Sequence, residues 1–323
     1  MSKLEKTVVP PATFTSYYGR PVVKPTPWEH DIPAYLFMGG VAAGSSLLSA
    51  GADLTGRPLL RRRGRLAALV ALSLSMVALV KDLGRPERFH HMLRVLKPTS
   101  PMSVGTWLLT VYGPFAGLAA ASELVPRRWR RTIPGRLLAG AGRPAGLAAA
   151  VVAPTVASYT AVLLSNTSTP TWHDAHEQLP FVFVGSASAA SGGLGLLAAP
   201  LSESAPARRL AVGGALLELA VESRMEKAMG LTAEPLHEGH AGRLMRLSKL
   251  LTGAGAAGAV LGRRSRVVSA ASGAALLAGS ACLRFGIFDA GQESARDPKY
   301  TVVPQRERVE AARLLDESTP AAR

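Results

Sequence analysis

The stretch that decides the fold is 32-IPAYLFMGGVAAGSSLLSAGADL-54, which is followed after an arginine-rich turn by 66-LAALVALSLSMVALVKDL-83. Neither stretch carries the polar stripe, recurring about every 3.6 residues, that marks the outer face of a soluble amphipathic helix. Both therefore need an apolar environment on every side. A lipid bilayer provides one, and its hydrocarbon core is spanned by a helix of roughly 20 apolar residues. The two stretches predict transmembrane helices.

The same pattern along the chain predicts an all-α, polytopic membrane helix bundle of about eight transmembrane helices. The expected spans are Ile32–Leu54, Leu66–Leu83, Ser103–Leu124, Ala145–Leu164, Leu179–Leu197, Ala207–Ser223, Leu247–Leu261 and Val267–Ile287. The sixth and seventh are the weakest, since apolar cores of about a dozen residues also suit a buried helix or a re-entrant segment. Residues 1–31 and 289–323 are expected to be extramembrane segments that flank a bundle over residues 32–288. The N-terminus has no apolar core, so we expect the first span to serve as an uncleaved signal.

Positive charge is concentrated between the apolar blocks. The net charge of +15 could suggest nucleic-acid binding, but that requires a soluble basic face with base-reading side chains. The arginines instead lie mainly in the loops after the first, third, fifth and seventh spans, which predicts that these loops are cytoplasmic. Both termini would then be non-cytoplasmic, in a multi-pass protein of the bacterial inner membrane that binds no nucleic acid.

The cysteine and histidine positions limit the redox centres that the chain can hold. Its one cysteine, Cys282, excludes a disulfide framework or an iron–sulfur cluster within the chain. A membrane haem needs axial histidines inside spanning helices, and none of the apolar blocks contains a histidine. We therefore expect no haem and no metal redox centre, so electron transfer would need an organic cofactor or a partner subunit.

All seven histidines fall on the non-cytoplasmic side of this topology: His30, His90, His91, His173, His176, His237 and His240. That side also receives Asp82, Arg85 and Asp174, so the mouth of the bundle is rich in titratable groups. The pairs three residues apart, His173 with His176 and His237 with His240, could each form half of a zinc site. Without a third ligand, solvated or hydrogen-bonded histidines are the favoured interpretation, and we expect no bound metal.

Two carboxylates lie within the sixth span. Glu218 and Glu222 are one helical turn apart and would share a face. An ionisable group in hydrocarbon costs roughly 2.5 to 3.5 kcal/mol on insertion scales, so it usually has a function or a partner. We weigh a proton relay through the bundle equally against a charged helix end paired with Arg224 or Lys227. Asp53 and Glu123, at cytoplasmic helix ends, are expected to pair with nearby arginines.

Three motifs stand out in the first half of the chain. They are Tyr35-Leu-Phe-Met-Gly-Gly-Val-Ala-Ala-Gly44, the loop Lys81-Asp-Leu-Gly-Arg-Pro-Glu-Arg-Phe89, and its continuation from Met92 through Pro98-Thr-Ser-Pro-Met-Ser103 to Trp107. These motifs resemble the NrfD/PsrC family, the membrane subunits of polysulfide-reductase-type molybdoenzyme complexes. The similarity runs from about Trp28 to Gly193 and includes the tail motif Asp297-Pro-Lys-Tyr-Thr301. The sixth and seventh spans match less distinctly.

The resemblance implies a haem-free bundle that binds a quinone, with menaquinone the expected type. The quinone would lie near the face where a ferredoxin-like iron–sulfur subunit docks, itself attached to a molybdenum or tungsten catalytic subunit. His30 and Tyr159 look like the positions that hydrogen-bond the quinone oxygens, and Asp82 and Arg85 belong to the motif that lines the site. Imidazole and phenol donors stabilise the negative charge of a reduced quinone and deliver protons.

Alternative roles remain open for several of these residues. Asp82 could instead form a salt bridge with Arg85 or Arg88 that shapes the loop. Asn166, His173, Asp174 and His176 are second-rank candidates that could also form the docking surface.

The expected function is electron transfer between an iron–sulfur subunit and the quinone pool, with Asp82, Glu218 and Glu222 as candidate proton carriers. A formate dehydrogenase-like partner is the first expectation, and a polysulfide, thiosulfate or tetrathionate reductase is the second. Two alternatives come from other classes. One is a proton or small-solute transporter that uses a Glu218/Glu222 path, and the other is a passive structural anchor.

Overall fold

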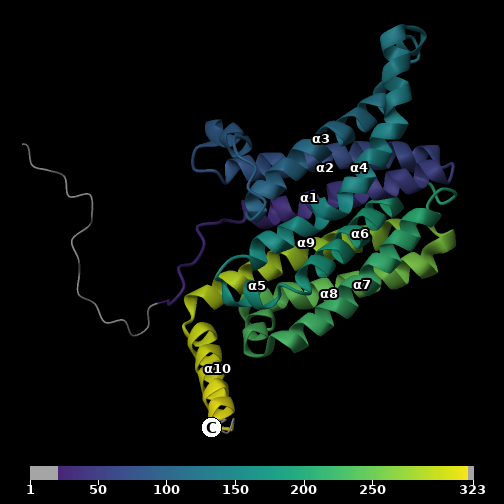
Figure 1. The fold of residues 1–323 in the computed structure, drawn as a ribbon. Helices are drawn as coiled ribbons and strands as arrows, with labels where there is room; N and C mark the ends of the chain where they lie inside the picture. The colour runs from purple at the N-terminus through teal and green to yellow at the C-terminus, as the bar shows by residue number, and fades with distance from the viewer. Residues whose placement is uncertain (1–20, 319–323) are drawn as a thin grey trace, which may run out of the picture.

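The structure, a computed structural model, describes residues 21–318, and over that range the chain is a helical bundle without β-strands (Figure 1). The long helices are α1 (Asp31–Leu54), α2 (Pro58–Lys81), α3 (Pro101–Leu124), α4 (Ile133–Ser165), α6 (Leu179–Ala198), α7 (Ala205–Met229), α8 (Gly239–Leu261) and α9 (Arg266–Arg296). Each corresponds to one of the expected spans. Parts of the two expected terminal segments, residues 1–20 and 319–323, lie outside the described residues.

Shorter helical elements connect the long ones. They are the 3-10 turns η1 (Pro86–Leu93), η2 (Trp129–Arg131), η3 (Gly230–Leu236) and η4 (Gly262–Arg264), the one-turn helix α5 (Pro170–Asp174) and the terminal helix α10 (Lys299–Ser318). Helix α10 points away from the bundle (Figure 1).

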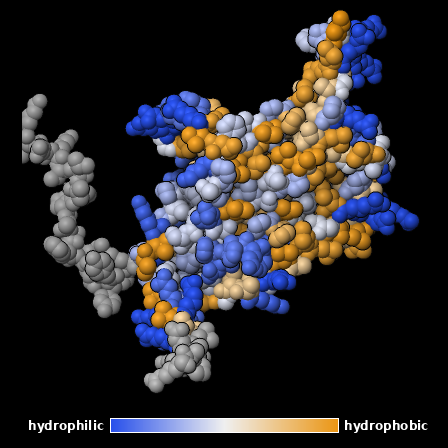
Figure 2. Space-filling model, viewed as in Figure 1, coloured by the Kyte–Doolittle hydropathy of each residue, from blue (hydrophilic) through white to orange (hydrophobic). Residues whose placement is uncertain are grey.

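Six of the long helices are long and apolar enough to cross a membrane: α1, α2, α3, α4, α6 and α9. Helices α7 and α8 are also long enough, but their charged residues lower their hydropathy, in line with the weakness expected of the sixth and seventh spans. Figure 2 shows apolar residues over the flank of the bundle and hydrophilic residues gathered mainly at its ends. The chain is therefore an all-α, multi-pass membrane protein.

Several helices extend beyond the apolar blocks that predicted them. Helix α2 begins at Pro58, ahead of Leu66, and α9 continues to Arg296, past the expected end of the bundle at residue 288. Helix α4 begins at Ile133 because Thr132 caps it, its side chain accepting a hydrogen bond from the backbone N–H of Gly135. Hydropathy marks where a helix enters lipid, whereas caps and prolines decide where its hydrogen bonding begins.

Helix α6 lies at the centre of the bundle, in contact with α1, α4, α7 and α9. Small residues allow this close packing. A side chain at Gly185 would collide with α7, because its Cβ would lie 2.7 Å from the backbone nitrogen of Glu218. Small residues at helix interfaces let backbones approach in this way in membrane bundles. The contact also brings Glu218 to the middle of the packed core.

An ionic network ties α1, α2 and α3 together at the end where α1 turns into α2. Arg65 lies 3.2 Å from Asp53 and 2.9 Å from Glu123, and Arg61 lies 3.2 Å and 2.8 Å from the same two carboxylates. The expected pairing of Asp53 and Glu123 with nearby arginines is confirmed. Because Arg65 is only 5% exposed, its two carboxylate partners are needed to offset its desolvation.

Candidate functional site

The segments that carry the histidines meet at the opposite end of the bundle. The backbone N–H of Glu29, ahead of α1, donates to Asp82 at the end of α2, over 3.4 Å. The hydroxyl of Thr171 in α5 donates to the carbonyl of Thr232 in η3, over 2.8 Å, and the N–H of Thr171 donates to Ser294 of α9. Segments far apart in the sequence therefore form one polar surface at this end.

A cavity of about 90 Å³ opens beside this contact, between α1, α2, α3 and α4. Its lining includes Asp82 and two tyrosines, Tyr35 and Tyr159, whose phenolic oxygens share a hydrogen bond. Gly105 of α3 lies directly against the ring of Tyr159, and a Cβ at that position would overlap it. Helix α3 thus carries a glycine where the tyrosine ring needs room.

The remaining walls of this cavity are mostly apolar. They consist of Trp28, Ile32, Leu79, Leu83, Met92, Met102, Thr106, Leu109 and Leu163. Few polar groups converge in an apolar enclosure, which is the usual composition of a small-molecule site. Phenol hydroxyls can donate hydrogen bonds and a carboxylate can accept a proton, so the lining suits a flat, apolar molecule with carbonyl or hydroxyl oxygens.

Asp82 follows the last residue of α2 and lies at the rim of the cavity. Partial burial raises the pKa of its carboxyl above the ordinary range, and the neighbouring charges of Asp31 and Glu29 act in the same direction. The hydrogen bond from the Glu29 N–H opposes them. Asp82 is therefore a carboxylate that takes up a proton more readily than a solvated aspartate does.

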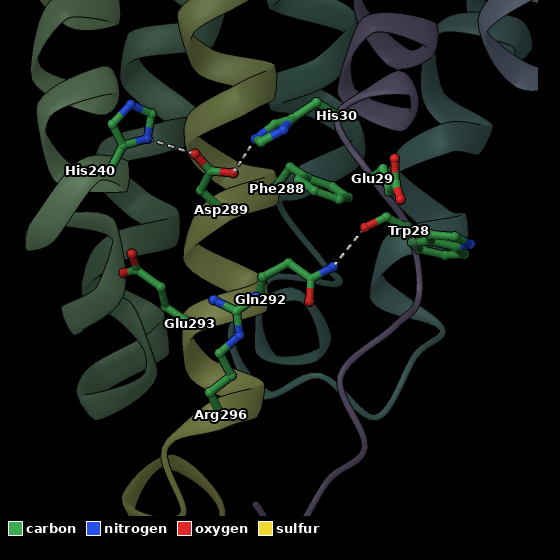
Figure 3. Close-up of a pocket in the computed structure, with 9 residues that line it drawn as sticks. All are labelled: Trp28, Glu29, His30, His240, Phe288, Asp289, Gln292, Glu293 and Arg296. Atoms are coloured by element: carbon green, nitrogen blue, oxygen red, sulfur yellow. Dashed lines mark hydrogen bonds and ion pairs between the residues drawn. The ribbon is translucent and has the colours of Figure 1, made fainter. Parts of the chain in front are cut away.

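His30 lies in a separate pocket of about 460 Å³ (Figure 3). Its Nε2 lies 3.5 Å from one oxygen of Asp289, and Nδ1 of His240 lies 2.8 Å from the other. One carboxylate of α9 thus bridges two histidines from distant segments. The structure brings Asp82 and Tyr159 into one cavity but does not bring His30 into it.

Trp28 lines both pockets and separates them. The segment that carries it is tied to α9, because the side-chain amide of Gln292 donates to the carbonyl of Trp28 over 3.3 Å (Figure 3). The same amide donates to the carbonyl of Thr26 over 3.2 Å. The Trp28 ring also stacks on Trp172, which is buried and donates to the carbonyl of Ile287. These contacts hold Trp28 in place as the wall shared by the two pockets.

Arg85 and Arg88 are exposed and lie outside the cavity. In the described part of the chain neither arginine forms an ion pair with Asp82, so the structure does not contain the salt bridge of the alternative interpretation. Asp82 is held by a backbone N–H instead.

The second-rank candidates lie elsewhere at the same end. Asn166, His173 and Asp174 line a pocket of about 510 Å³ beside α10. Nδ1 of His173 lies 3.1 Å from the Ser165 carbonyl, and Nδ1 of His176 lies 3.0 Å from the His173 carbonyl. These histidines are bound to backbone oxygens, and in the described part of the chain no group of three acidic, histidine or cysteine side chains is placed to hold a metal. The zinc alternative lacks a third ligand.

Glu218 and Glu222 of α7 share a face, as expected, and both are fully buried. Glu218 accepts a hydrogen bond from Thr252 over 3.0 Å, while Glu222 has Lys249 of α8 at 3.7 Å. Of the two interpretations of these carboxylates, the one that pairs them with Arg224 or Lys227 is therefore wrong about the charged partner, which for Glu222 is Lys249. The sequence could not show this, because Lys249 reaches α7 only through helix packing.

The buried polar groups of this half of the bundle continue toward its outer end. Lys249 also binds Glu226 over 2.7 Å, and Glu226 lies 4.0 Å from Nε2 of His237. Both oxygens of Glu222 and one of Glu218 have no hydrogen-bond partner within the described residues. The groups form a line from the exposed His237 into the core.

Three residues in or near these sites were not predicted from the sequence. Arg284, fully buried in α9, lies with its guanidinium 3.5 Å above the Phe183 ring, and its position inside an apolar block was a usable signal. Tyr35 begins the first motif, but the motif alone predicts no role for its hydroxyl. Asp289 gave no comparable signal, because its partners come from other helices.

The fold defines a polytopic helical membrane protein, and a small, mostly apolar cavity lies near one of its two ends. The family model described as "Polysulphide reductase, NrfD" matches residues 22–215. The chain belongs to the NrfD family, whose members are membrane subunits of polysulfide-reductase-like oxidoreductase complexes. No curated protein sequence matches the chain.

Proposed function

We propose that the chain is the haem-free, quinone-reactive membrane anchor of a multi-subunit oxidoreductase. It would pass electrons between an iron–sulfur subunit and the membrane quinone pool. One observation carries the proposal: Asp82, Tyr35 and Tyr159 converge in an apolar cavity although they come from three different helical segments.

The donor set fits a quinone head group. A quinone has two carbonyl oxygens that gain negative charge on reduction, and phenol hydroxyls are suited to stabilise that charge. The aromatic and aliphatic walls suit its ring. A quinone bound here would supply the two-electron chemistry, and the side chains of the chain would orient it and exchange its protons.

The roles of the polar residues follow from their positions. Tyr159 would donate to a carbonyl oxygen, and Tyr35 would orient the Tyr159 hydroxyl through their shared hydrogen bond. Asp82, at the rim, would accept or return a proton, and its raised pKa suits that role. His30 would act from the adjoining pocket, with Trp28 lying between it and the cavity.

The cavity must enlarge to admit a ring, because about 90 Å³ is well below the roughly 300–1,000 Å³ of typical ligand sites. Met92 belongs to η1, an element without a single buried residue. Since η1 is held by few contacts, we infer that it is the wall that moves.

The partners would be a ferredoxin-like iron–sulfur subunit and a molybdenum or tungsten catalytic subunit. A formate dehydrogenase-like enzyme is our first choice, and a polysulfide or thiosulfate reductase is the second. The quinone would be menaquinone. The surface around Asn166, His173, Asp174 and His176 lies at the same end as the cavity and is the proposed docking face.

A second role concerns α7 and α8. Glu218 and Glu222 lie in line with Lys249, Glu226 and His237, and three of the four oxygens of the two buried carboxylates have no partner in the described residues. We propose that this line carries protons between the histidine end and the core. If it worked without redox partners, the protein would be a proton transporter.

The test is to purify the native complex, identify its subunits by mass spectrometry and measure quinol oxidation. Co-purification of an iron–sulfur subunit, with turnover blocked by a quinone-site inhibitor, supports the proposal. A protein isolated without partners that moves protons in vesicles favours the transporter. An optical spectrum with haem absorption from this chain would refute the haem-free assignment.

A further inference from the structure

The connection between α3 and α4 projects sideways from the bundle (Figure 1). Helix α3 ends at Leu124, η2 forms the tip, and the first turns of α4 return toward the core. Arg143, 3.8 Å from Asp53, marks where α4 reaches the bundle again. We call residues 124–142 the α3–α4 tip. It lies at the end opposite the cavity, so it has no part in the quinone site.

The α3–α4 tip is strongly basic. Its five arginines, all exposed, are Arg127, Arg128, Arg130, Arg131 and Arg136, and the segment contains no acidic residue. Arg130 donates to the carbonyl of Val125 over 3.3 Å. The other four form no ion pair with any side chain of residues 21–314. Their charge is available to an anionic partner outside the chain.

The same segment exposes large apolar side chains. Trp129 is 58% exposed, Ile133 66% and Leu137 70%. Ile133 and Leu137 are one turn apart and share a face of α4. Arg136 directly precedes Leu137 and so lies roughly 100° away from it around the helix axis. Figure 2 shows apolar residues on one flank of the projection and hydrophilic residues on the other. The tip is therefore amphipathic, although none of its apolar face packs on the core.

The direction in which the α3–α4 tip projects indicates which environment surrounds its apolar face. The spanning helices cross the bilayer along the axis of the bundle, and the tip extends across that axis at one end (Figure 1). A segment in that position lies along the boundary between lipid tails and head groups. Basic amphipathic segments bind there by burying apolar side chains and contacting anionic phosphates.

We propose that the α3–α4 tip lies on the membrane surface and binds anionic phospholipid head groups. Trp129, Ile133 and Leu137 enter the edge of the acyl layer, and the unpaired arginines contact lipid phosphates. A guanidinium binds phosphate oxygens through two parallel hydrogen bonds, which suits this ligand. The contact holds the tilted α3–α4 pair at a set depth, at the end where the ionic network joins α1, α2 and α3.

The first experiment measures lipid retention by native mass spectrometry of the full chain in detergent, with phosphatidylglycerol or phosphatidylcholine added. Each arginine near an anionic surface contributes several-fold to binding. The variant R127Q/R128Q/R131Q/R136Q should lose at least about tenfold in phosphatidylglycerol binding and little in phosphatidylcholine binding. The control R62Q/R63Q/R263Q/R264Q removes four exposed arginines from the same end and should lose less. Equal losses in the two variants overturn the proposal.

The second experiment measures depth and does not depend on the stability of the multiple variant. Nitroxide labels are placed at L137C or R136C, in a C282A background, and the protein is reconstituted in anionic bilayers. The label at 137 should be relaxed more by oxygen, and the label at 136 more by a water-soluble nickel complex. The proposal is overturned if both labels are relaxed more by the nickel complex than by oxygen, because both positions would then lie in water. Two labels shielded from both reagents in the native complex also overturn it, because a protein partner would then cover the tip.

Discussion

Tyr35 and Tyr159 share a hydrogen bond between their phenolic oxygens, although they lie 124 positions apart in the sequence. The bond joins helices α1 and α4, and both tyrosines line the cavity that Asp82 also lines. The two hydroxyls are buried from water, and a hydrogen bond to an incoming oxygen would replace or extend their own. This pair is the polar centre of the proposed quinone site.

Replacing Tyr159 by phenylalanine should lower quinol oxidation by the native complex by about 10²-fold, because the ring stays and the donor is lost. Electron transfer from the catalytic subunit to a soluble dye should remain unchanged. The matched control is Tyr112→Phe, which removes a buried hydroxyl bound to Ser46 and Ala42 away from the cavity. Equal turnover in Tyr159→Phe and wild type would leave only a structural role for this tyrosine.

Asp82 should produce an acidic limb in the pH profile of quinol oxidation. An ordinary aspartate has a pKa of about 3.9. Burial raises the pKa of Asp82 above its ordinary value, so its carboxylate form is lost at a higher pH. Turnover should fall as the pH drops through that raised pKa, and Asp82→Asn should be slow and lack the limb. Asp31→Asn removes a negative charge that raises the pKa of Asp82, so it should shift the limb to lower pH. A limb that persists in Asp82→Asn assigns the titration to another group.

Glu222→Gln should separate proton movement from electron transfer. The amide keeps the size of the buried side chain but cannot carry a proton, so proton uptake by vesicles containing the complex should fall while dye-linked electron transfer continues. Lys249→Met should also lower proton uptake, since Lys249 is the charged neighbour of Glu222. Glu238→Gln, at an exposed position ahead of α8, serves as the control. Unchanged proton uptake in Glu222→Gln contradicts the proposed path.

Arg65→Met should destabilise the bundle. The change removes one partner from a buried network. It leaves Glu123 with Arg61, and Asp53 with Arg61 and the exposed Arg143, a loss of about 3–5 kcal/mol for a buried pair. Arg61→Met should cost less, because that side chain is 31% exposed and screened by solvent. Thermal unfolding in detergent, followed by circular dichroism, checks the order of the two variants. If Arg61→Met lowered the unfolding temperature more than Arg65→Met, Arg65 would not be the main stabilising partner of the two carboxylates.

Much of the architecture was predictable because few backbone structures are stable inside a lipid bilayer. Every backbone polar group must be bonded inside the hydrocarbon, so long apolar blocks such as Ile32–Leu54 had to become helices. The weaker hydropathy of α7 and α8 was visible as well. Helix ends were predicted less accurately, since α4 starts where Thr132 caps it and not where its apolar block begins.

The candidate site was predictable only in part. The loop motif placed Asp82 near the mouth, and the family resemblance selected Tyr159. The alternative that paired Glu222 with Arg224 or Lys227 was wrong, because local spacing cannot show that Lys249 of another helix lies beside it. The separation of His30 from Tyr159 depends on Trp28, whose position is set by Gln292 and Trp172.

The sequence by itself determined that this chain spans a membrane as helices and that its histidines lie outside the apolar blocks, because hydrophobicity and charge act on each segment separately. Only the tertiary structure decided that Asp82 meets two tyrosines in one cavity while His30 faces Asp289 in another. Those neighbours are chosen by how helices pack against each other, and packing depends on residues scattered over the whole chain.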